Sequence, residues 1–295
     1  SARASRSVRA VSPGRGTGSR DRRSPDQPSL ERRGRSVEAG AMDITGNTIF
    51  IPGATSGIGL ALALRLQARG NTVIVGGRRE DRLAAIAAAH PELHTVRIDT
   101  ADPASIDETA ASVLAAHPTL NVLVTMAGIM RAEDWTTPAG FLSTAEETVT
   151  TNILGPIRLI AAFIEHLQAQ PSATIMTVSS GLAFAPLKVT PTYNASKAAI
   201  HMLSESLRLQ LAGTTVAVQE LEPPAVRTDL MPGHAENEAA LPLDAFIDEV
   251  MTLIETQPDA TEIQVERVKF LRYGEARGDY DEVVAVLNRT DPHGR

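Results

Sequence analysis

Short apolar runs alternate with longer amphipathic stretches along the chain from about residue 45 onward. The short runs have the length and β-branched content of buried strands, and the longer stretches carry apolar residues at helical spacing. Consecutive parallel strands need a crossover between them, usually a helix, so this alternation predicts a parallel sheet covered by helices. We therefore expect an α/β fold with one doubly wound parallel sheet, helices on both faces, and ligands at the carboxyl ends of the strands.

The individual elements follow from this pattern. Strands are expected at residues 48–51, 72–75, 94–98, 122–124, 174–178, 215–221 and 263–265. Helices are expected at residues 57–68, 80–89, 103–116, 144–168 with a bend at Pro156, from Tyr193 onward, at 243–256 and at 281–287. A loop rich in small residues, at about 229–245, is where a substrate lid would lie. Residues 42–295 thus form one expected domain that ends in a helical segment.

Residues 1–41 differ in composition from the rest of the chain. They hold ten of the 28 basic residues, all arginine, and four acidic residues, a net charge of +6 against −13 for the remainder. Rich in Ser, Arg, Pro and Gly, this segment lacks the apolar surface needed to fold. An upstream translation start before Met42, a transit peptide and a basic nucleic-acid-binding tail are the alternatives. The acidic residues argue against a transit peptide, and we favour a disordered, non-functional extension.

The composition also limits the classes of partner. The chain has no cysteine, so it has neither disulfides nor thiolate metal ligands, and we expect no metal site. No apolar run approaches the ~18 residues that a membrane span would need. The excess of acidic residues after residue 41 argues against polyanionic partners such as nucleic acids. We expect a cytoplasmic protein that acts on a small molecule and contacts no membrane.

The first candidate chemistry involves Tyr193, Lys197 and Ser180. Tyr193 and Lys197 lie four residues apart in a predicted helix, which places both side chains on one face. A free tyrosine has a pKa near ~10, too high for efficient proton transfer at neutral pH. A nearby cation favours the phenolate, so we expect Lys197 to lower the pKa of Tyr193. The hydroxyl of Ser180, at the end of a predicted strand, could bind a substrate oxygen; such a Tyr-Lys pair alone is also common on surface helices.

A second signal lies at the end of the first predicted strand. Gly53, Gly57 and Gly59 fall in a turn between that strand and a predicted helix. Glycines there permit a tight turn and the close approach of a pyrophosphate to the backbone. The anion would rest at the helix N-terminus, where free N–H groups and the helix dipole favour negative charge.

Together these residues resemble a known family. The Gly-x-x-x-Gly-x-Gly turn, Ser180 and Tyr193-x-x-x-Lys197 are similar to the motifs of the short-chain dehydrogenases/reductases, in the same order, over nearly all of residues 45–230. The runs Ser180-Gly181-Leu182-Ala183-Phe184 and Pro223-Pro224-Ala225-Val226 resemble the DltE-type oxidoreductase branch. The resemblance implies a Rossmann-type sheet and hydride transfer between a nicotinamide dinucleotide and an alcohol or carbonyl substrate. It also implies a homodimer or homotetramer.

The resemblance further implies roles for particular residues. The catalytic set would be Asn152, Ser180, Tyr193 and Lys197, with Asn152 supporting a water relay to the lysine. The cofactor-binding set would be Gly53, Thr55, Ser56, Gly57, Ile58, Gly59, Arg78, Arg79, Asp99, Ala127, Gly128, Tyr193, Lys197, Val226 and Thr228. Asp99 would contact the adenine, although a loop-capping role for this aspartate is the alternative.

Charge at the end of the second strand favours NADP(H) over NAD(H). An NAD-binding protein normally has a carboxylate there for the adenosine ribose, whereas this chain has Arg78 and Arg79. Two guanidinium groups suit a 2′-phosphate through charge-assisted hydrogen bonds. Alternatively, the two arginines are solvated and neutralised by Glu80 and Asp81.

Three positions depart from the family pattern. Pro52 replaces the usual threonine, Thr125-Met126 replaces Asn-Asn, and Pro224 replaces a glycine. The first and fourth strands should be neighbours, so Pro52 and Thr125-Met126 should lie together under the cofactor. Such a repacked floor raises the alternative of a non-catalytic dinucleotide-binding or scaffold protein. The retention of Asn152, Ser180, Tyr193 and Lys197 favours the enzyme.

Overall fold

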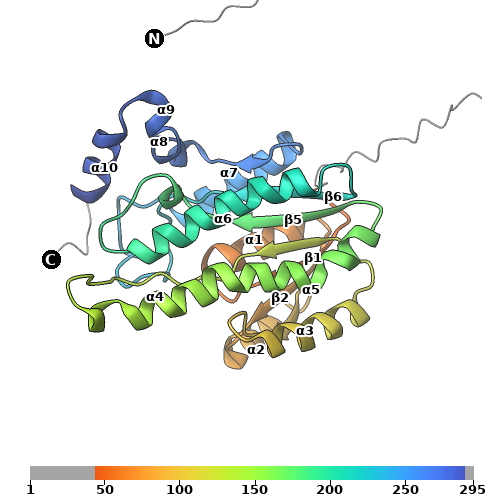
Figure 1. The fold of residues 1–295 in the computed structure, drawn as a ribbon. Helices are drawn as coiled ribbons and strands as arrows, with labels where there is room; N and C mark the ends of the chain where they lie inside the picture. Colours follow the sequence, from red (N-terminus) through yellow and green to blue (C-terminus); the bar gives the residue numbers. More distant parts are fainter. Residues whose placement is uncertain (1–43, 290–295) are drawn as a thin grey trace, which may run out of the picture. The chain divides into compact units, whose positions relative to one another are not determined.

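The computed structural model describes residues 44–289, all of which belong to the unit Ser36–Arg295. The expected extension at residues 1–41 therefore lies outside the described residues. One parallel sheet has the strand order β3-β2-β1-β4-β5-β6-β7 (Figure 1), which confirms the doubly wound topology. Its strands are β1 (Thr48–Pro52), β2 (Thr72–Gly77), β3 (His94–Arg97), β4 (Val122–Thr125), β5 (Ala173–Val178), β6 (Val216–Leu221) and β7 (Glu262–Ile263).

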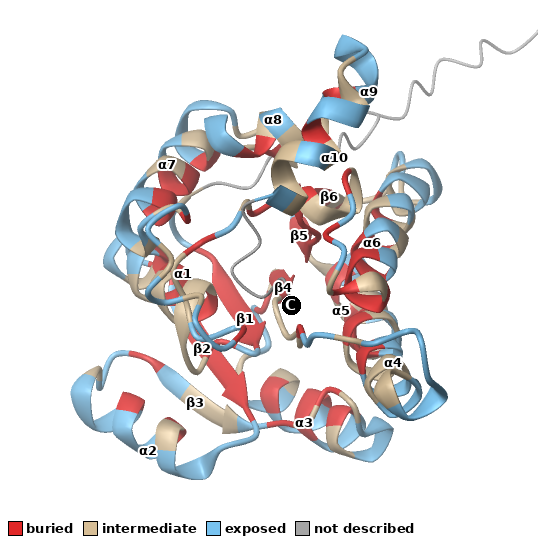
Figure 2. Ribbon diagram, turned by 90° about the vertical axis from the view of Figure 1, so that its left-hand side faces the viewer, coloured by how far each residue is buried: buried red, intermediate tan, exposed pale blue. Residues whose placement is uncertain are grey.

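Helices cover both faces of this sheet, as predicted. The helices are α1 (Gly57–Ala68), α2 (Glu80–Ala89), α3 (Pro103–Ala116), α4 (Leu142–Val149), α5 (Gly155–Ala169), α6 (Pro191–Gln210), α7 (Leu243–Thr256), α8 (Lys269–Arg272), α9 (Gly274–Arg277) and α10 (Tyr280–Arg289). Figure 2 shows α1 and α7 on one side of the buried strands and α3, α5 and α6 on the other. Within residues 44–289, no helix is long and apolar enough to cross a membrane.

Side-chain alternation along the strands divides the core into two layers. Ile49 and Ile51 of β1 point into the cluster shared with α1, α2 and α7, while Phe50 between them points into the cluster of α3 and α5. All residues of β1, β4 and β5 are buried. Strands buried on both faces explain the continuous apolar runs in the sequence.

Three predicted elements need correction. The helix expected at 144–168 extends without interruption from Leu142 to Ala169, but it contains a π-helical turn at Thr150–Leu154 that joins α4 to α5. Pro156 lies directly after this turn, as the second residue of α5. The last strand is only Glu262–Ile263, not 263–265. The loop expected to extend to about residue 245 ends at Pro242, since α7 begins at Leu243.

Parallel pairing brings the carboxyl ends of the strands to one edge of the sheet. β1 pairs with β2 on one side and β4 on the other, so the order of connections reverses between β1 and β4. Ligands of such sheets bind outside this reversal point, where the loops diverge to opposite faces. The segments that follow β1, β2, β4, β5 and β6 all line a single cavity there.

Candidate active site

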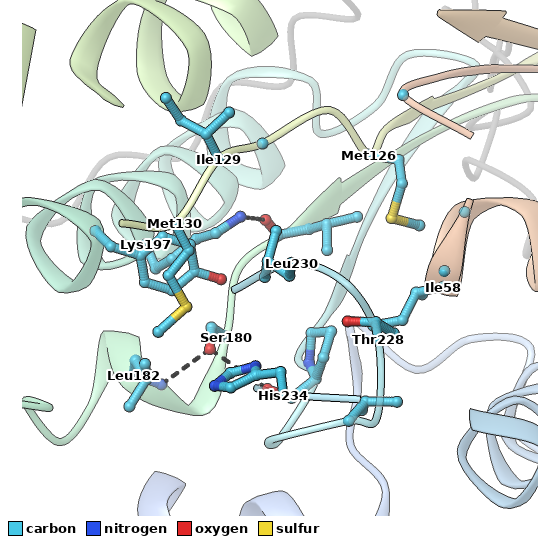
Figure 3. A pocket seen from close by; sticks show the side chains of 18 of the residues that line it. Ile58, Met126, Ile129, Met130, Ser180, Leu182, Lys197, Thr228, Leu230 and His234 are labelled. Atoms are coloured by element: carbon cyan, nitrogen blue, oxygen red, sulfur yellow. Dashed lines mark hydrogen bonds between the residues drawn. The ribbon is translucent and has the colours of Figure 1, made fainter. Parts of the chain in front are cut away.

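The cavity at the carboxyl edge of the sheet has a volume of about 940 Å³. It extends from the glycine-rich turn after β1 to the start of α6 and the C-terminal helices. Of the predicted site residues, the following line it: Gly53, Thr55, Ser56, Gly57, Ile58, Gly59, Arg78, Arg79, Asp99, Ala127, Gly128, Ser180, Tyr193, Lys197, Val226 and Thr228. Figure 3 shows Ile58, Met126 and Thr228 at one end and Ser180 and Lys197 at the other. Asn152 is buried behind this surface and does not line the cavity.

The glycine-rich turn leaves the N-terminus of α1 open to the cavity. Gly53 and Gly57 have positive φ values of 91° and 56°, which glycine adopts without strain. A Cβ at Gly53 would lie only 2.5 Å from the Cα of Ala127, so the turn also packs closely against the segment after β4. The N-cap residue Ser56 makes no capping hydrogen bond. The first N–H groups of α1 have no partner within the helix and can receive an anion.

Arg78 and Arg79 lie at the far end of this turn. The Nη2 of Arg79 donates a hydrogen bond to the Oγ1 of Thr55 over 3.2 Å, which holds the guanidinium beside the turn. Glu80, which with Asp81 would neutralise the arginines in the alternative interpretation, pairs with Arg97 over 3.3 Å. Among residues 44–289, no ion pair to Arg78 or Arg79 is present, and both arginines line the cavity.

Asp99 caps a loop, which is one of the two roles that the sequence left open. Its carboxylate accepts a hydrogen bond from the backbone N–H of Ala101 over 3.0 Å, which is a loop cap. Its own N–H donates to the Oγ of Ser105 over 2.9 Å. The side chain is only half buried and lines the cavity, so its second carboxylate oxygen remains accessible to a ligand.

Ser180, Tyr193 and Lys197 converge at the other end of the cavity. Lys197 lies one helical turn beyond Tyr193 in α6, with its Nζ 5.5 Å from the centroid of the phenol ring. The Nζ also donates to the carbonyl oxygen of Val178 over 2.8 Å, which ties α6 to the end of β5. The hydroxyl of Ser180 accepts from the N–H of Leu182 over 3.1 Å and donates to the carbonyl oxygen of Pro223 over 3.4 Å. Because the hydrogen bond to Pro223 is long, the hydroxyl of Ser180 can donate to a substrate oxygen in its place.

Burial controls the protonation of the two α6 side chains. It raises the pKa of Tyr193 to about 12, and the Ser180 hydroxyl offsets that rise only in part. It lowers the pKa of Lys197 to about 8, with the carboxylate of Glu220 acting in the opposite direction. The expectation that Lys197 brings the pKa of Tyr193 below its ordinary value is wrong for this structure. Burial removes the phenolate from water, and this loss of hydration raises the pKa of Tyr193.

Asn152 acts on the backbone beside the site. It lies in the π-helical turn, and its amide accepts from the N–H of Ile129 over 2.8 Å and donates to the carbonyl of the same residue over 2.9 Å. Its Nδ2 also donates to the Oγ of Ser196 over 3.2 Å. A Cβ at Gly128 would lie 3.4 Å from Asn152 Oδ1 and 3.8 Å from Lys197 Nζ. The asparagine therefore fixes the segment after β4 against α6.

Two of the three departures from the family pattern, Pro52 and Thr125-Met126, lie together at the ends of β1 and β4. The register of the two strands places Pro52 near Thr125, because Phe50 pairs with Leu123. The Oγ1 of Thr125 is buried and has no hydrogen-bond partner. The side chain of Met126 lies over α1, with its Cγ 3.0 Å from where a Cβ of Gly59 would be. The substituted residues lie together, as expected, and the cavity beside them is open.

A buried polar cluster lies outside the cavity, between α6, β6, β7 and α8. The potential metal-ligating atoms of His201, Glu220, Glu222 and Glu262 lie within 4.8 Å of one another. Arg208 pairs with Glu220 over 3.3 Å, and Arg272 pairs with Glu262 over 3.1 Å. These guanidinium groups supply the positive charge that a metal ion would otherwise bring.

Sequence reasoning missed the apolar part of the cavity. Met130, Leu182 and Leu187 line it beside the catalytic residues, and Phe270, Leu271, Val286 and Leu287 line it from the C-terminal helices. In sequence, these residues are indistinguishable from ordinary core positions. Only the proximity of α8 and α10 to the end of β5 reveals their place, and no local motif encodes that contact.

Comparisons with known proteins agree with this geometry. A sequence profile of the family described as short chain dehydrogenase matches residues 47–239. The chain is 39% identical over 249 residues to the uncharacterized oxidoreductase DltE of Bacillus subtilis (strain 168), covering 84% of this chain and 98% of that protein. It is 31% identical over 206 residues to retinol dehydrogenase 13 of Homo sapiens, covering 63% of this chain and 61% of that protein. A solved short chain dehydrogenase from Burkholderia cenocepacia J2315 in complex with NADP has a TM-score of 0.71 and 24% identity, covering 83% of this chain and 99% of that one.

Proposed function

Because this chain belongs to the short-chain dehydrogenase family of oxidoreductases, we propose that it interconverts an alcohol and a carbonyl group with NADP(H). One observation carries the proposal. A single cavity joins the open N-terminus of α1 to the converging side chains of Ser180, Tyr193 and Lys197. A dinucleotide bound along this cavity would have its phosphates at one end and its reactive ring beside a proton donor at the other.

The residues at the α1 end fit the cofactor. The uncapped helix start and the glycine turn suit a pyrophosphate, and Arg78 and Arg79 suit a 2′-phosphate. A protein of similar fold, the short chain dehydrogenase from Burkholderia cenocepacia, is solved in complex with NADP, which supports the same cofactor class here. When bound, the nicotinamide would supply or accept the hydride, and the protein would supply binding, orientation and proton transfer.

We assign the proton transfer to Tyr193. Its raised pKa of about 12 keeps the phenol protonated at neutral pH, so it can donate to a substrate oxygen. Ser180 would donate a hydrogen bond to the same oxygen and polarise the carbonyl. Lys197 would stabilise the negative charge that develops on the phenol. Asn152, which does not line the cavity, would position the segment after β4.

The scaffold alternative predicts a closed or distorted dinucleotide site. Met126 lines the cavity without filling it, and the turn residues from Gly53 to Gly59 remain accessible along it. The unpartnered hydroxyl of Thr125 costs some stability but lies below the cavity surface. These observations support the enzyme over the scaffold.

The test is NADPH oxidation in the presence of carbonyl compounds by the wild type and by Tyr193→Phe. We expect Tyr193→Phe to lower kcat on the order of 10²–10⁴-fold, because general acid catalysis is lost. NADPH affinity should stay within about threefold, since the phenol hydroxyl carries no phosphate contact.

The chain offers a matched control in Tyr273→Phe. The hydroxyl group of Tyr273 donates a hydrogen bond to Gln264, and Tyr273 does not line the cavity. Its variant should keep the activity of the wild type. A Tyr193→Phe protein as active as Tyr273→Phe would refute the assignment of Tyr193.

A further inference from the structure

The cavity extends beyond the catalytic residues into a region that the cofactor proposal does not explain. We propose that this region binds the carbon chain of an uncharged, apolar aldehyde or ketone, or of the matching alcohol. The inference rests on the proposed function and names its substrate class. It is carried by three features of the described residues: the apolar lining, the exposure of two apolar side chains, and the placement of the charged groups.

The catalytic phenol belongs to an apolar cluster. Tyr193 packs with the buried side chains of Met130, Leu187 and Met231, and the partly buried Leu182 and Leu287 pack against them. These residues come from the segments after β4, β5 and β6 and from α10. Figure 3 shows Met130 and Leu182 flanking Ser180 and Lys197. A substrate whose oxygen reaches Ser180 and Tyr193 would therefore be surrounded by hydrocarbon on several sides.

Two large apolar side chains on the cavity wall are exposed to water. Leu230, in the segment after β6, is 40% exposed, and Phe270 in α8 is 42% exposed. Exposed apolar surface beside a cavity is typical of binding sites, because a ligand can cover it. An apolar chain that leaves the catalytic oxygen toward the solvent would bury both side chains.

Two charged groups of this region disfavour an anion, and the first is Arg131, which is ion-paired with Glu147. The guanidinium of Arg267 donates to the backbone carbonyl of Ala239, which directs this group but does not neutralise its charge. Asp229, also on the cavity wall, would repel a carboxylate or phosphate. The amide of Asn237 already caps the N–H of Ala239. An anionic group would lose its hydration here, and it could pair with Arg131 only by displacing Glu147.

The direct test compares two series of aldehydes under NADPH. Butanal, hexanal, octanal and decanal form the first series, and the same compounds with a carboxylate at the far end form the second. We expect kcat/KM to rise about two- to fourfold per added methylene in the first series, until the chain reaches solvent. Each carboxylated compound should fall at least tenfold below its uncharged counterpart. Equal or greater kcat/KM for the carboxylated series would overturn the inference.

Matched variants locate the effect. Leu230→Ser and Phe270→Ser should each flatten the dependence of kcat/KM on chain length, because the apolar contact is removed. Leu209→Ser is the control, since Leu209 is 81% exposed in α6 and does not line the cavity. A slope unchanged in both Leu230→Ser and Phe270→Ser would contradict the proposed path of the chain.

A binding measurement separates this inference from the proposed reaction. Unreactive amides of the same chain lengths, and octanamide with a terminal carboxylate, are titrated calorimetrically into the wild-type protein with saturating NADPH. Tighter binding of longer amides without reduction of any aldehyde would support the apolar site and refute the proposed reaction. Reduction of aldehydes with preferred binding of the carboxylated amide would refute the apolar site and leave the reaction standing.

Discussion

At the scale of single residues, burial decides the protonation of the site. Tyr193 and Lys197 lie next to each other in a buried position, and burial raises the pKa of the phenol to about 12 and lowers that of the ammonium group to about 8. Each group shifts toward its neutral form, because the charged form loses its hydration. Near neutral pH the phenol keeps its proton and the ammonium group keeps its charge, which is the state needed to protonate a substrate oxygen.

Glu222 gives a pH dependence of stability that can be measured. Burial, with the nearby charges of Glu220 and Glu262, raises the pKa of Glu222 from 4.5 to about 9. The folded protein therefore holds a proton that the unfolded chain releases near pH 4.5, and the free energy of unfolding should fall as the pH rises between these values.

Glu222→Gln should abolish this decrease in the free energy of unfolding. The amide oxygen can still accept from Gln264, which now bonds the carboxyl group over 3.0 Å. In urea denaturation at pH 8 we expect the variant to be more stable than the wild type by at least about 1 kcal/mol, and the difference to shrink toward pH 5. Glu165→Gln, at an exposed position of α5, is the control and should follow the wild type. Parallel pH profiles for Glu222→Gln and the wild type would show that Glu222 is not protonated.

The sequence could predict those site residues whose spacing is local. The glycine turn, the Arg78-Arg79 pair and the Tyr193-Lys197 pair line one cavity as expected, because each lies within one turn or one helix. The predicted direction of the pKa shift of Tyr193 was wrong, because burial of the phenol depends on chain segments that are far away in sequence. Phe270 escaped prediction for the same reason.

At the scale of elements, several bounds were predicted accurately. The helices α2, α3 and α7 begin and end at the predicted residues. The π-helical turn between α4 and α5 was missed, because it places Asn152 for tertiary hydrogen bonds to Ile129 that no local pattern reveals. β7 has only two residues, too few for a period of two to show.

The packing of α1 predicts that replacing a helical glycine by alanine destabilises the protein, the opposite of the usual effect. Gly59 lies in α1, where alanine would ordinarily stabilise a helix by about 1 kcal/mol. A Cβ there would lie 2.8 Å from the backbone Cα of Ala54. We therefore expect Gly59→Ala to destabilise the protein by about 1–3 kcal/mol in chemical denaturation and to weaken NADPH binding. A variant as stable as the wild type would show that α1 is free to move away from the turn.

At the scale of the whole molecule, the chain brings its two halves to one edge of the sheet. The segments after β1 and β2 provide the proposed phosphate sites, and those after β5 and β6 provide the proposed chemistry. The C-terminal helices α8 and α10 complete the wall beyond the proposed catalytic residues. The parallel direction of the strands produces this convergence, which is why the fold class was predictable from the pattern of elements.

A prediction at the scale of the whole molecule concerns the N-terminal segment. A chain that begins at Met42 should have the NADPH affinity and kcat of the full chain, because the composition of residues 1–41 points to a non-functional extension. Side-by-side fluorescence titration and turnover measurements would check this. A loss of affinity or activity on truncation would assign a role to the extension.

The most direct test of the account is a fluorescence titration of NADPH and NADH into the protein. We expect micromolar affinity for NADPH and much weaker binding of NADH. The double variant Arg78→Ser with Arg79→Ser should bind NADPH roughly ten- to a hundredfold more weakly, because it loses charged hydrogen bonds to the 2′-phosphate. Arg82→Ser is the control and should keep its NADPH affinity, since Arg82 does not line the cavity. Binding of neither dinucleotide would contradict the account and favour the scaffold alternative.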